Sequence, residues 1–364
     1  MFELDLEAVF NDRCTYCGVC AFACDKVRMD EETEIPRINQ VYRSTCVMCH
    51  ELCPRGSLDI ESIEKSVFGE QRTDLAMGVY KKIVQARSKD SDIVKRAQSG
   101  GFVSSLLISA LEQGIIDCAI VTNSELTKDE RAQPVVVDSK EGILAASGSK
   151  YTPVPAVLGL RDAIDQGYQK IGFVGLPCHI EGLRKLQTSQ YDITGVNRVS
   201  LVIGLLCSKS YSYNEFMQVA KAEVGNEKIR KYDIKGSKFY IYTDENTYTI
   251  PLKNLKPAAR TACEVCIDYS AELADLSAGS VGAPDGYSSV IIRSERGLQA
   301  FKSGVEQDYI EFQDMEPKDI AKIKQQVLKK RIAGFEEITS HIDPIKLMHL
   351  VVKPSKLRIE PLLE

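Results

Sequence analysis

The spacing of the cysteines near the N-terminus constrains this chain more than any other feature. The chain has 12 cysteines in 364 residues, and seven of them lie before residue 54. That is too few for a disulfide scaffold of this length, yet more than packing requires. The seven form two runs: a C-x2-C-x2-C-x3-C run at Cys14, Cys17, Cys20 and Cys24, and a C-x2-C-x3-C-P run at Cys46, Cys49 and Cys53. We therefore predict that they bind iron or another metal.

The two runs have the spacing of bacterial ferredoxins, in which three thiolates of one run hold one iron–sulfur cluster and the fourth reaches a second cluster. This spacing predicts a first thiol set and a second thiol set. The first set is Cys14, Cys17, Cys20 and Cys53, and the second is Cys24, Cys46 and Cys49. A zinc ribbon built from Cys14/Cys17 and Cys46/Cys49 is the alternative, but it would leave three cysteines at ferredoxin spacing without a role.

The second set lacks one ligand at the expected place, because position 43 is Arg43. The cluster there is expected to be a three-iron cluster, a cube with an oxygen or imidazole ligand, or a cube completed from elsewhere in the chain. His50 is a candidate ligand by adjacency alone, and a solvated histidine is the alternative. The first run also has Asp25 where ferredoxins usually have proline.

Composition and charge exclude several classes of protein. A hydrophobic fraction of 44% with 27% charged residues is typical of a globular chain of two or three domains. The net charge is 46 − 51 = −5, so no nucleic-acid partner is expected. Residues 1–9 carry acids where a signal peptide would be basic, and the most apolar stretch, 101–121, contains Glu112 and Asp117. We expect a cytoplasmic protein without a membrane span, which reaches a membrane only through a partner.

Beyond residue 78 the pattern predicts an α/β body. Ser99-Gly100-Gly101 precedes a helix over 102–111, which ends near Gly114, and a strand follows over 115–122. Two glycines that open a helix expose backbone N–H groups suited to a pyrophosphate, although a tight turn without a ligand is the alternative.

Two apolar strands, 170–175 and 200–206, are each followed by a cysteine at the end where open α/β sheets bind ligands. A helix over 180–186 follows the first strand, and a hairpin over 238–243 and 247–251 precedes a C-x2-C pair. These four thiols form a body set that would hold one further cube: Cys178, Cys207, Cys263 and Cys266. For Cys178 and Cys207 a structural role in the core is the alternative, and Cys118 is expected to be a core residue.

Five segments of the body together resemble one known family, the beta subunits of coenzyme F420 hydrogenases and dehydrogenases. The segments are Gln98–Leu107, Ala146–Thr152, Val174–Gly182, Ala262–Asp275 and Gly279–Gly286. The family includes the F420-oxidising subunit of F420 dehydrogenase and the N-terminal half of F420-dependent sulfite reductase. The N-terminal cysteine runs make this chain more similar to those members than to the hydrogenase subunit.

The resemblance implies a flavoprotein that exchanges a hydride with coenzyme F420, its substrate, and that contains FAD and about three [4Fe-4S] clusters. It implies that the body set holds the cluster beside the flavin. It also implies FAD contacts from three segments: Ser99, Gly100, Gly101, Phe102, Val103 and Ser104; Gly148, Ser149, Lys150, Tyr151 and Thr152; and Gly282, Ala283, Pro284, Asp285 and Gly286. An ordinary exposed lysine at Lys150 and a turn cap at Asp285 are the alternatives.

The predicted architecture is a mixed α/β flavoprotein body behind an N-terminal two-cluster ferredoxin-like domain. The expected units are residues 1–65 for the ferredoxin-like domain, 66–78 for a linker, 79–315 for the FAD- and F420-binding body, and 316–364 for a C-terminal helical extension. The basic stretch 318–331 of that extension is expected to be a solvated helix face.

The predicted function is an F420-dependent oxidoreductase subunit that relays single electrons to or from a partner. The expected partner is another subunit of a redox complex, of the dehydrogenase, hydrogenase or heterodisulfide-reductase type, or a ferredoxin. Two alternatives stay open: a ferredoxin-fed flavoprotein reductase of another substrate, such as a pigment, and a non-catalytic electron-transfer adaptor. The sequence does not decide the direction of electron flow.

Overall fold

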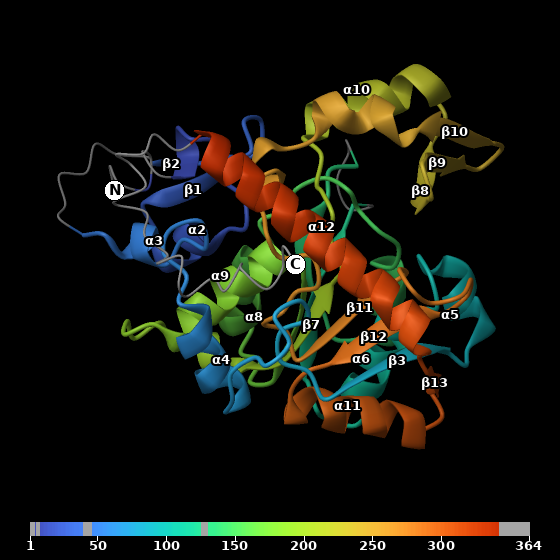
Figure 1. Cartoon of the computed structure of the whole chain (residues 1–364), viewed down its shortest axis with the longest axis horizontal. Helices are drawn as coiled ribbons and strands as arrows, with labels where there is room; N and C mark the ends of the chain where they lie inside the picture. The colour runs from blue at the N-terminus through green and yellow to red at the C-terminus, as the bar shows by residue number, and fades with distance from the viewer. Residues whose placement is uncertain (1–3, 5–7, 39–45, 125–129, 342–364) are drawn as a thin grey trace.

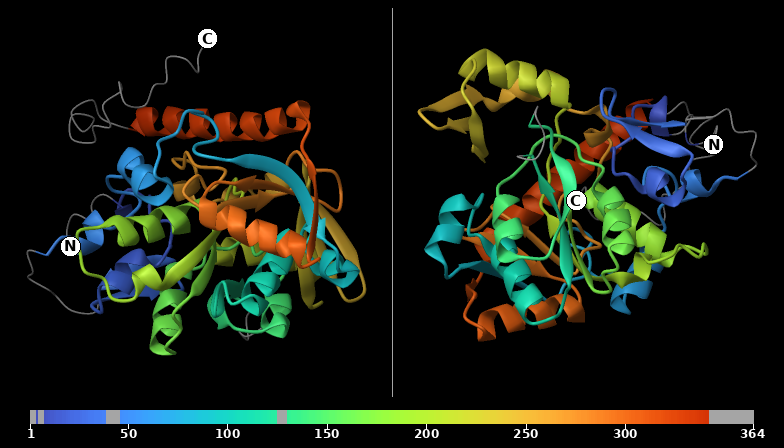
Figure 2. Two further views of the ribbon diagram at one scale, coloured as in Figure 1. Left: turned by 90° about the horizontal axis from the view of Figure 1, so that it is seen from below. Right: turned by 180° about the vertical axis from the view of Figure 1, so that it is seen from behind.

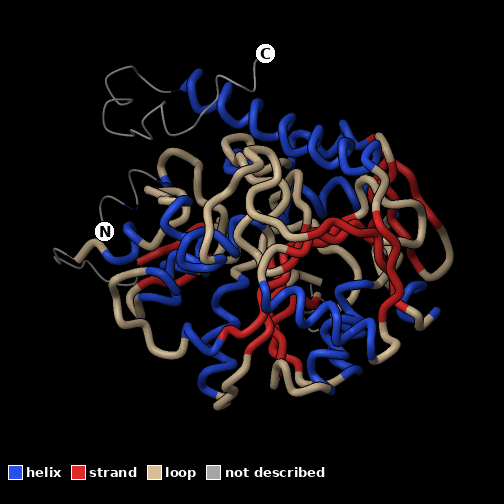
Figure 3. The backbone as a smooth tube through the Cα atoms, turned by 60° about the horizontal axis from the view of Figure 1, so that its bottom comes forward, coloured by secondary structure: helices blue, strands red, loops and turns tan. Residues whose placement is uncertain are grey.

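A computed structural model of the chain describes residue 4 and residues 8–38, 46–124 and 130–341. Its centre is an eight-stranded mixed sheet in the order β13-β3-β12-β11-β7-β6-β4-β5 (Figure 3). The strands are β3 (Lys82–Ser88), β4 (Cys118–Asn123), β5 (Gln133–Val137), β6 (Ile171–Gly175), β7 (Val199–Leu205), β11 (Leu276–Gly279), β12 (Ser288–Ile292) and β13 (Ile310–Asp314). The expected mixed α/β body is confirmed.

The two faces of the sheet carry separate apolar cores, because side chains alternate along each strand. On β4, Cys118 and Ile120 join one core, while Ala119 and Val121 join the other. The first core packs under α8 (Gly159–Asp165) and α9 (Pro177–Thr188). The second packs under α6 (Phe102–Glu112), α7 (Lys140–Ala145) and α11 (Glu295–Glu306). Cys118 is thus a core residue, as expected.

Most strands of the sheet end at one common edge. Strands β4, β6, β7 and β11 are mutually parallel, and β3 runs in the same direction because β12 pairs antiparallel with both β11 and β3. The carboxyl ends of β3, β6, β7 and β11 therefore lie along one edge. The segments after these strands contain Ser99–Ser104, Cys178, Cys207 and Gly282–Gly286.

The predicted elements of the body are largely confirmed. Helix α6, strands β6 and β7, and the hairpin of β9 (Lys238–Thr243) and β10 (Thr247–Pro251) lie where the pattern placed them. Strand β4 starts three residues later than expected. The backbone N–H groups of Ile115 and Ile116 both donate to the carbonyl of Ala110, so these residues close helix α6 instead of pairing in the sheet.

Two smaller units lie on the body as separate lobes (Figure 2). One contains α2 (Val19–Ala23), β1 (Val27–Asp30), β2 (Ile35–Ile38), α3 (Met48–Glu51) and α4 (Ile60–Phe68). The other packs α10 (Tyr213–Val224) on a three-stranded sheet of β8 (Ile229–Lys235), β9 and β10. Helix α4 extends past residue 65 to Phe68, and Met77 within the segment 66–78 is fully buried.

The last described element is α12 (Pro317–His341), a long helix that crosses the sheet (Figure 1). Ile323 and Val327 on α12 pack on Ile83 and Ile291 of the sheet. The expectation of a solvated basic face is wrong for the end of the stretch 318–331, where Arg331 is buried. None of the described helices has both the length and the apolar composition that a membrane span needs.

Candidate functional site

The first thiol set surrounds one small pocket. Cys14, Cys17, Cys20 and Cys53 all line it, together with Pro54 and residues of β1 and β2. Three of these thiols lie in or before α2, where the left-handed Gly18 turns the chain between Cys17 and the helix, and Cys53 follows α3. Burial raises the pKa of Cys14 to about 11 and that of Cys17 to about 12. The fold thus gathers the four residues that the ferredoxin spacing groups together.

The second thiol set lies on the outer side of the same unit. Cys49 is buried on α3, whereas Cys46 is exposed just before that helix. Burial raises the pKa of Cys49, and the nearby thiols Cys24 and Cys46 raise it further. Position 43, where a fourth ligand was expected, lies outside the described residues. His50 is partly exposed beside Cys49 on the same helix.

The body set comes together at the carboxyl edge of the sheet. Cys178 lies in the first turn of α9 after β6, and Cys207 follows the neighbouring parallel strand β7. The backbone N–H of Cys207 donates to the carbonyl of Tyr269 at 2.9 Å, which brings the segment of Cys263 and Cys266 to the same place. Burial raises the pKa of Cys207 to about 12, and Cys263 and Cys266 add to this effect.

The body set and the first thiol set are neighbours. Helix α9 passes so close to α2 that a Cβ atom on Gly182 would lie 2.4 Å from Cγ2 of Val19. The carbonyl of Cys17 accepts a hydrogen bond from the backbone N–H of Val157, at 3.1 Å. Burial raises the pKa of Cys178 well above its usual value, and both Cys266 and Cys17 contribute. One continuous apolar core joins the two units at this contact.

Basic side chains accompany these thiols. Lys330 on α12 donates to the carbonyl of Cys207 at 2.8 Å, and Arg260 donates to the carbonyl of Cys14 at 2.8 Å. Arg55, two residues after Cys53, pairs with Glu181 on α9. Positive charge beside buried thiols favours their thiolate form, which is the form that binds metal. The surroundings therefore fit groups of metal-bound thiolates.

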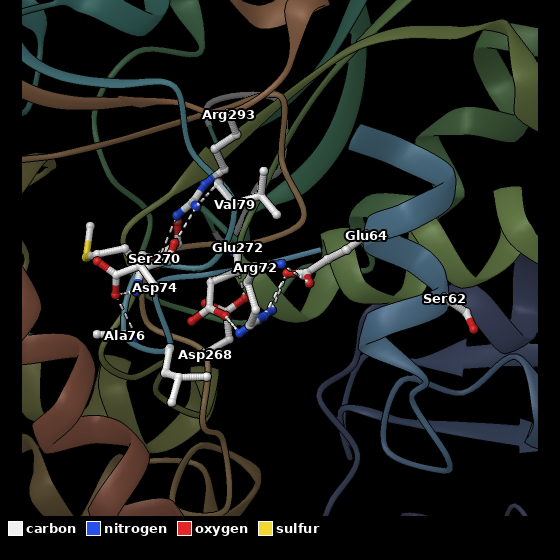
Figure 4. A network of polar contacts seen from close by, with 12 residues as sticks. Ser62, Glu64, Arg72, Asp74, Ala76, Val79, Asp268, Ser270, Glu272 and Arg293 are labelled. Atoms are coloured by element: carbon white, nitrogen blue, oxygen red, sulfur yellow. Dashed lines mark hydrogen bonds and ion pairs between the residues drawn. The ribbon is translucent and has the colours of Figure 1, made fainter. Parts of the chain in front are cut away.

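A buried polar network holds the segment that follows Cys266 (Figure 4). Arg72 donates to Glu64 of α4 at 2.8 Å and to Glu272 at 2.5 Å, and Arg331 of α12 pairs with the other oxygen of Glu272. Burial alone would raise the pKa of Glu272, but Arg331, Arg72 and Arg293 outweigh it and hold the pKa below its usual value. The network thereby ties the segment of the body set to both the N-terminal unit and α12.

The three segments expected to contact FAD lie next to one another. A Cβ atom on Gly100 would lie 2.9 Å from the carbonyl carbon of Tyr287, which directly follows the segment 282–286. The backbone N–H of Ser149 donates to the side chain of Gln98 at 3.4 Å. Ser210 links this region to the body set, because its hydroxyl donates to the carbonyl of Tyr151 and its N–H lies 3.3 Å from Sγ of Cys263.

The two glycines at the start of α6, Gly100 and Gly101, also have structural roles. The N–H of Gly100 donates to the hydroxyl of Ser288 at 3.1 Å, and Gly101 has a left-handed φ of 72°. The N-cap of α6 makes no side-chain capping bond, which leaves the first turn open to an anionic group. This N-terminus fits a pyrophosphate through the turn after Gly101 rather than through the N–H of Gly100.

Lys150 and Asp285, two of the residues expected to contact FAD, lie in different surroundings. The ammonium group of Lys150 donates to three carbonyls at the end of α7 and just after it, those of Ala146, Ser147 and Gly148. Asp285 is exposed on a turn that the N–H of Tyr287 closes onto the carbonyl of Pro284. Lys150 therefore has a helix-capping role in this structure.

Sequence reasoning missed the charged residues around the thiols. Arg55, Glu181, Lys330 and the Glu272 network carry no periodicity or spacing signal, although Glu181 and Glu272 lie inside segments that the resemblance singled out. Among the described residues, no group of three or more His, Cys, Asp or Glu side chains is arranged to hold a single metal ion.

Comparison with known proteins identifies the body of the chain. Residues 83–161 match the family model of the N-terminal region of the coenzyme F420 hydrogenase/dehydrogenase beta subunit, and residues 168–318 match the model of its C-terminal region. The chain is 40% identical to the coenzyme F420 hydrogenase subunit beta of Methanothermobacter thermautotrophicus over 66% of this chain and 87% of that protein.

Two further proteins extend the comparison. The coenzyme F420-dependent sulfite reductase of Methanocaldococcus jannaschii is 33% identical over 91% of this chain, which spans about half (51%) of that longer protein. A chain in the structure of the F420-reducing [NiFe] hydrogenase complex from Methanosarcina barkeri superimposes with a TM-score of 0.69 at 32% identity, over 73% of this chain and 94% of that one. The chain therefore belongs to the coenzyme F420 hydrogenase/dehydrogenase beta-subunit family.

Proposed function

We propose that this protein is an F420-dependent oxidoreductase subunit that exchanges a hydride between coenzyme F420 and FAD and relays single electrons through [4Fe-4S] clusters to or from a partner protein. The observation that carries the proposal is the contiguity of the site. The segments proposed to contact FAD, the body set and the first thiol set lie next to one another in the described part of the chain.

FAD suits this role because a flavin exchanges both one and two electrons, whereas coenzyme F420 carries hydride and a cubane cluster carries one electron at a time. The first turn of α6 would bind the pyrophosphate, and the segments 148–152 and 282–286 would enclose the rest of the cofactor. The open side of Gly286, where an added Cβ atom would meet nothing within 4 Å, leaves room at the rim of this site.

The thiol sets define the order of the relay. The body set lies beside the proposed flavin segments, the first set lies across the α9–α2 contact, and the second set includes the exposed Cys46. Electrons would enter or leave the molecule at that exposed end. A partner there would be another subunit of a redox complex or a ferredoxin, in keeping with the hydrogenase complex that contains the similar solved chain.

An anaerobic assay of viologen reduction by reduced coenzyme F420 tests the proposal directly. We expect F420-dependent dye reduction by the wild-type protein. In Cys207→Ser we expect intact N-terminal cluster spectra and retained flavin reduction by F420, with loss of electron delivery to the dye. Dye reduction by Cys207→Ser at the wild-type rate would contradict the assignment of the body set. Flavin reduction only by a reduced ferredoxin would favour a reductase of another substrate, and no flavin reduction by either would favour an adaptor.

A further inference from the structure

The side chain of Arg55 lies between the first thiol set and the body set. It follows Cys53 of the first set by two residues, and its guanidinium pairs with Glu181 of α9. Glu181 is one helical turn after Cys178, so the two side chains share a face of that helix. The side chain of Arg55 is only 10% exposed. The charged side chain of Arg55, in the N-terminal unit, thus contacts Glu181 in the body.

The charge of Arg55 acts on both sets. Its guanidinium lies within electrostatic reach of Cys53 in the first set and of Cys178 and Cys266 in the body set. In addition, the Nε–H group of Arg55 is buried and has no hydrogen-bond partner within the described residues. A buried N–H without a partner is costly, and hydrogen bonds to cluster sulfurs are one means by which proteins set cluster potentials.

Lys330, a second cation beside the body set, provides a contrast. Its ammonium group donates to the carbonyl of Cys207, and its charge acts on Cys207, Cys263 and Cys266, which all belong to the body set. The charge of Lys330 therefore acts on the thiols of one set, whereas the charge of Arg55 acts on thiols of two sets.

We propose that Arg55 is a positioning residue that raises the reduction potentials of two clusters together, and so keeps them matched for electron transfer across the contact between the N-terminal unit and the body. This inference rests on the proposed function, because it requires clusters on both sets. The physical reason is that reduction adds a negative charge to a cluster, and a fixed cation nearby stabilises that charge more than it stabilises the oxidised form.

Potentiometric titration followed by electron paramagnetic resonance tests this on the purified holoprotein. In Arg55→Gln we expect the equilibrium constant for one-electron reduction to fall about tenfold at both clusters, which is a shift of about 59 mV to more negative potential. Arg55→Lys keeps the charge and should leave both constants within about threefold of wild type. Lys330→Gln is the matched control and should lower the constant of the body cluster alone.

Several results would overturn the inference. These are a shift at only one cluster in Arg55→Gln, unchanged potentials at both clusters, or a loss in Arg55→Lys as large as that in Arg55→Gln. If Arg55→Gln does not assemble because Glu181 is left buried without its partner, the double variant Arg55→Gln/Glu181→Gln is compared with Glu181→Gln, and the difference between their potentials measures the effect of the Arg55 charge. Iron content and flavin reduction by F420 are measured on every variant. Absence of clusters from the wild-type protein refutes the proposed function, whereas unshifted potentials in an iron-replete variant refute only the role of Arg55.

Discussion

At the scale of single residues, the proposed flavin site depends on the first turn of α6. The two glycines before this turn are required by the backbone: a Cβ atom on Gly100 would lie 2.8 Å from the carbonyl oxygen of Ala86, and Gly101 is left-handed. Replacing either glycine would disturb the fold whether or not a cofactor binds there. A side chain inside the turn is a better probe, and Ser104, the third residue of the helix, is partly exposed.

We predict that Ser104→Asp weakens FAD binding at least tenfold without unfolding the protein. A carboxylate in the first turn of a helix stabilises the helix itself, by about 0.3–1 kcal/mol, but repels a bound pyrophosphate. Ser104→Asn is the uncharged control and should keep the flavin. Titration of the apoprotein with FAD, followed by flavin fluorescence, measures the effect. Equal FAD affinity in Ser104→Asp and wild type would place the pyrophosphate elsewhere.

At the scale of elements, the contact between α9 and α2 sets the separation of the body set from the first set. Glycine inside a helix costs about 1 kcal/mol relative to alanine, so Gly182 in α9 needs a compensating reason. The structure provides one, since Val19 of α2 occupies the space where a Cβ atom would be. The glycine allows the two helices, and with them Cys178 and Cys17, to approach closely.

We predict that Gly182→Ala destabilises the protein by roughly 1–2 kcal/mol, because overpacking outweighs the gain in helix propensity. In a Val19→Ala background the same change should be neutral or stabilising, since the clashing atom is gone. Thermal unfolding of the four proteins of this cycle measures the coupling. Rapid-freeze spectroscopy should also show slower reduction of the first cluster in Gly182→Ala alone. Destabilisation of equal size in both backgrounds would disprove this account of the contact.

An ion pair is one of the contacts that hold helix α12 to the segment 70–78. Lys324 donates to Asp74 at 2.6 Å, and the N–H groups of Ala76 and Met77 donate to the other carboxylate oxygen. Burial alone would raise the pKa of Asp74, but these donors outweigh burial and lower it. A lowered pKa in the folded state means that the ionised carboxylate stabilises the fold.

We predict that Asp74→Asn lowers the stability at neutral pH by up to about 1 kcal/mol, because the amide keeps the two backbone bonds and loses only a partly exposed ion pair. The advantage of the wild type is fully present above the unfolded pKa of about 3.9 and disappears as the pH falls through the lower folded value. Thermal midpoints of both proteins between pH 3 and 7 test this. A difference that stays constant across the range would show that ionisation of Asp74 is not the cause.

At the scale of the whole molecule, eleven cysteines fall into three groups. Four surround the pocket of the N-terminal unit, three lie on its outer side, and four lie at the carboxyl edge of the sheet. The polar network around Glu272 and the packing of α12 join these parts into one body. Because the groups lie on different elements, assembly of the relay depends on the complete fold.

We predict about eleven or twelve irons per chain after anaerobic reconstitution, depending on the second set. Four irons or fewer, with a full complement of FAD, would refute the two-unit relay. Cys49→Ser should remove only the outer cluster and leave flavin reduction by F420 intact in a single turnover. Loss of all clusters in that variant would instead mean that the second set supports the fold of the whole N-terminal unit.

The sequence by itself determined the features that arise from neighbours along the chain. The C-x2-C spacings group thiols that share one turn or loop, and the apolar periodicity placed α6, β6, β7 and the β9–β10 hairpin within a few residues of their true bounds. The order of cysteines after successive strands also predicted correctly that Cys178 and Cys207 meet at one sheet edge, since β6 and β7 are adjacent and parallel.

Only the tertiary structure decided which charges accompany those thiols. Arg55 and Glu181 are 126 residues apart, and Lys330 lies 123 residues from Cys207. No local rule relates residues so distant, because their meeting depends on how α9 packs on α2 and how α12 crosses the sheet. The same holds for the basic stretch 318–331, which would be solvated on an isolated helix. In the folded protein its last residue, Arg331, is buried and pairs with the buried Glu272. Long-range packing, which creates both the burial and the partner, determines the electrostatics of this site.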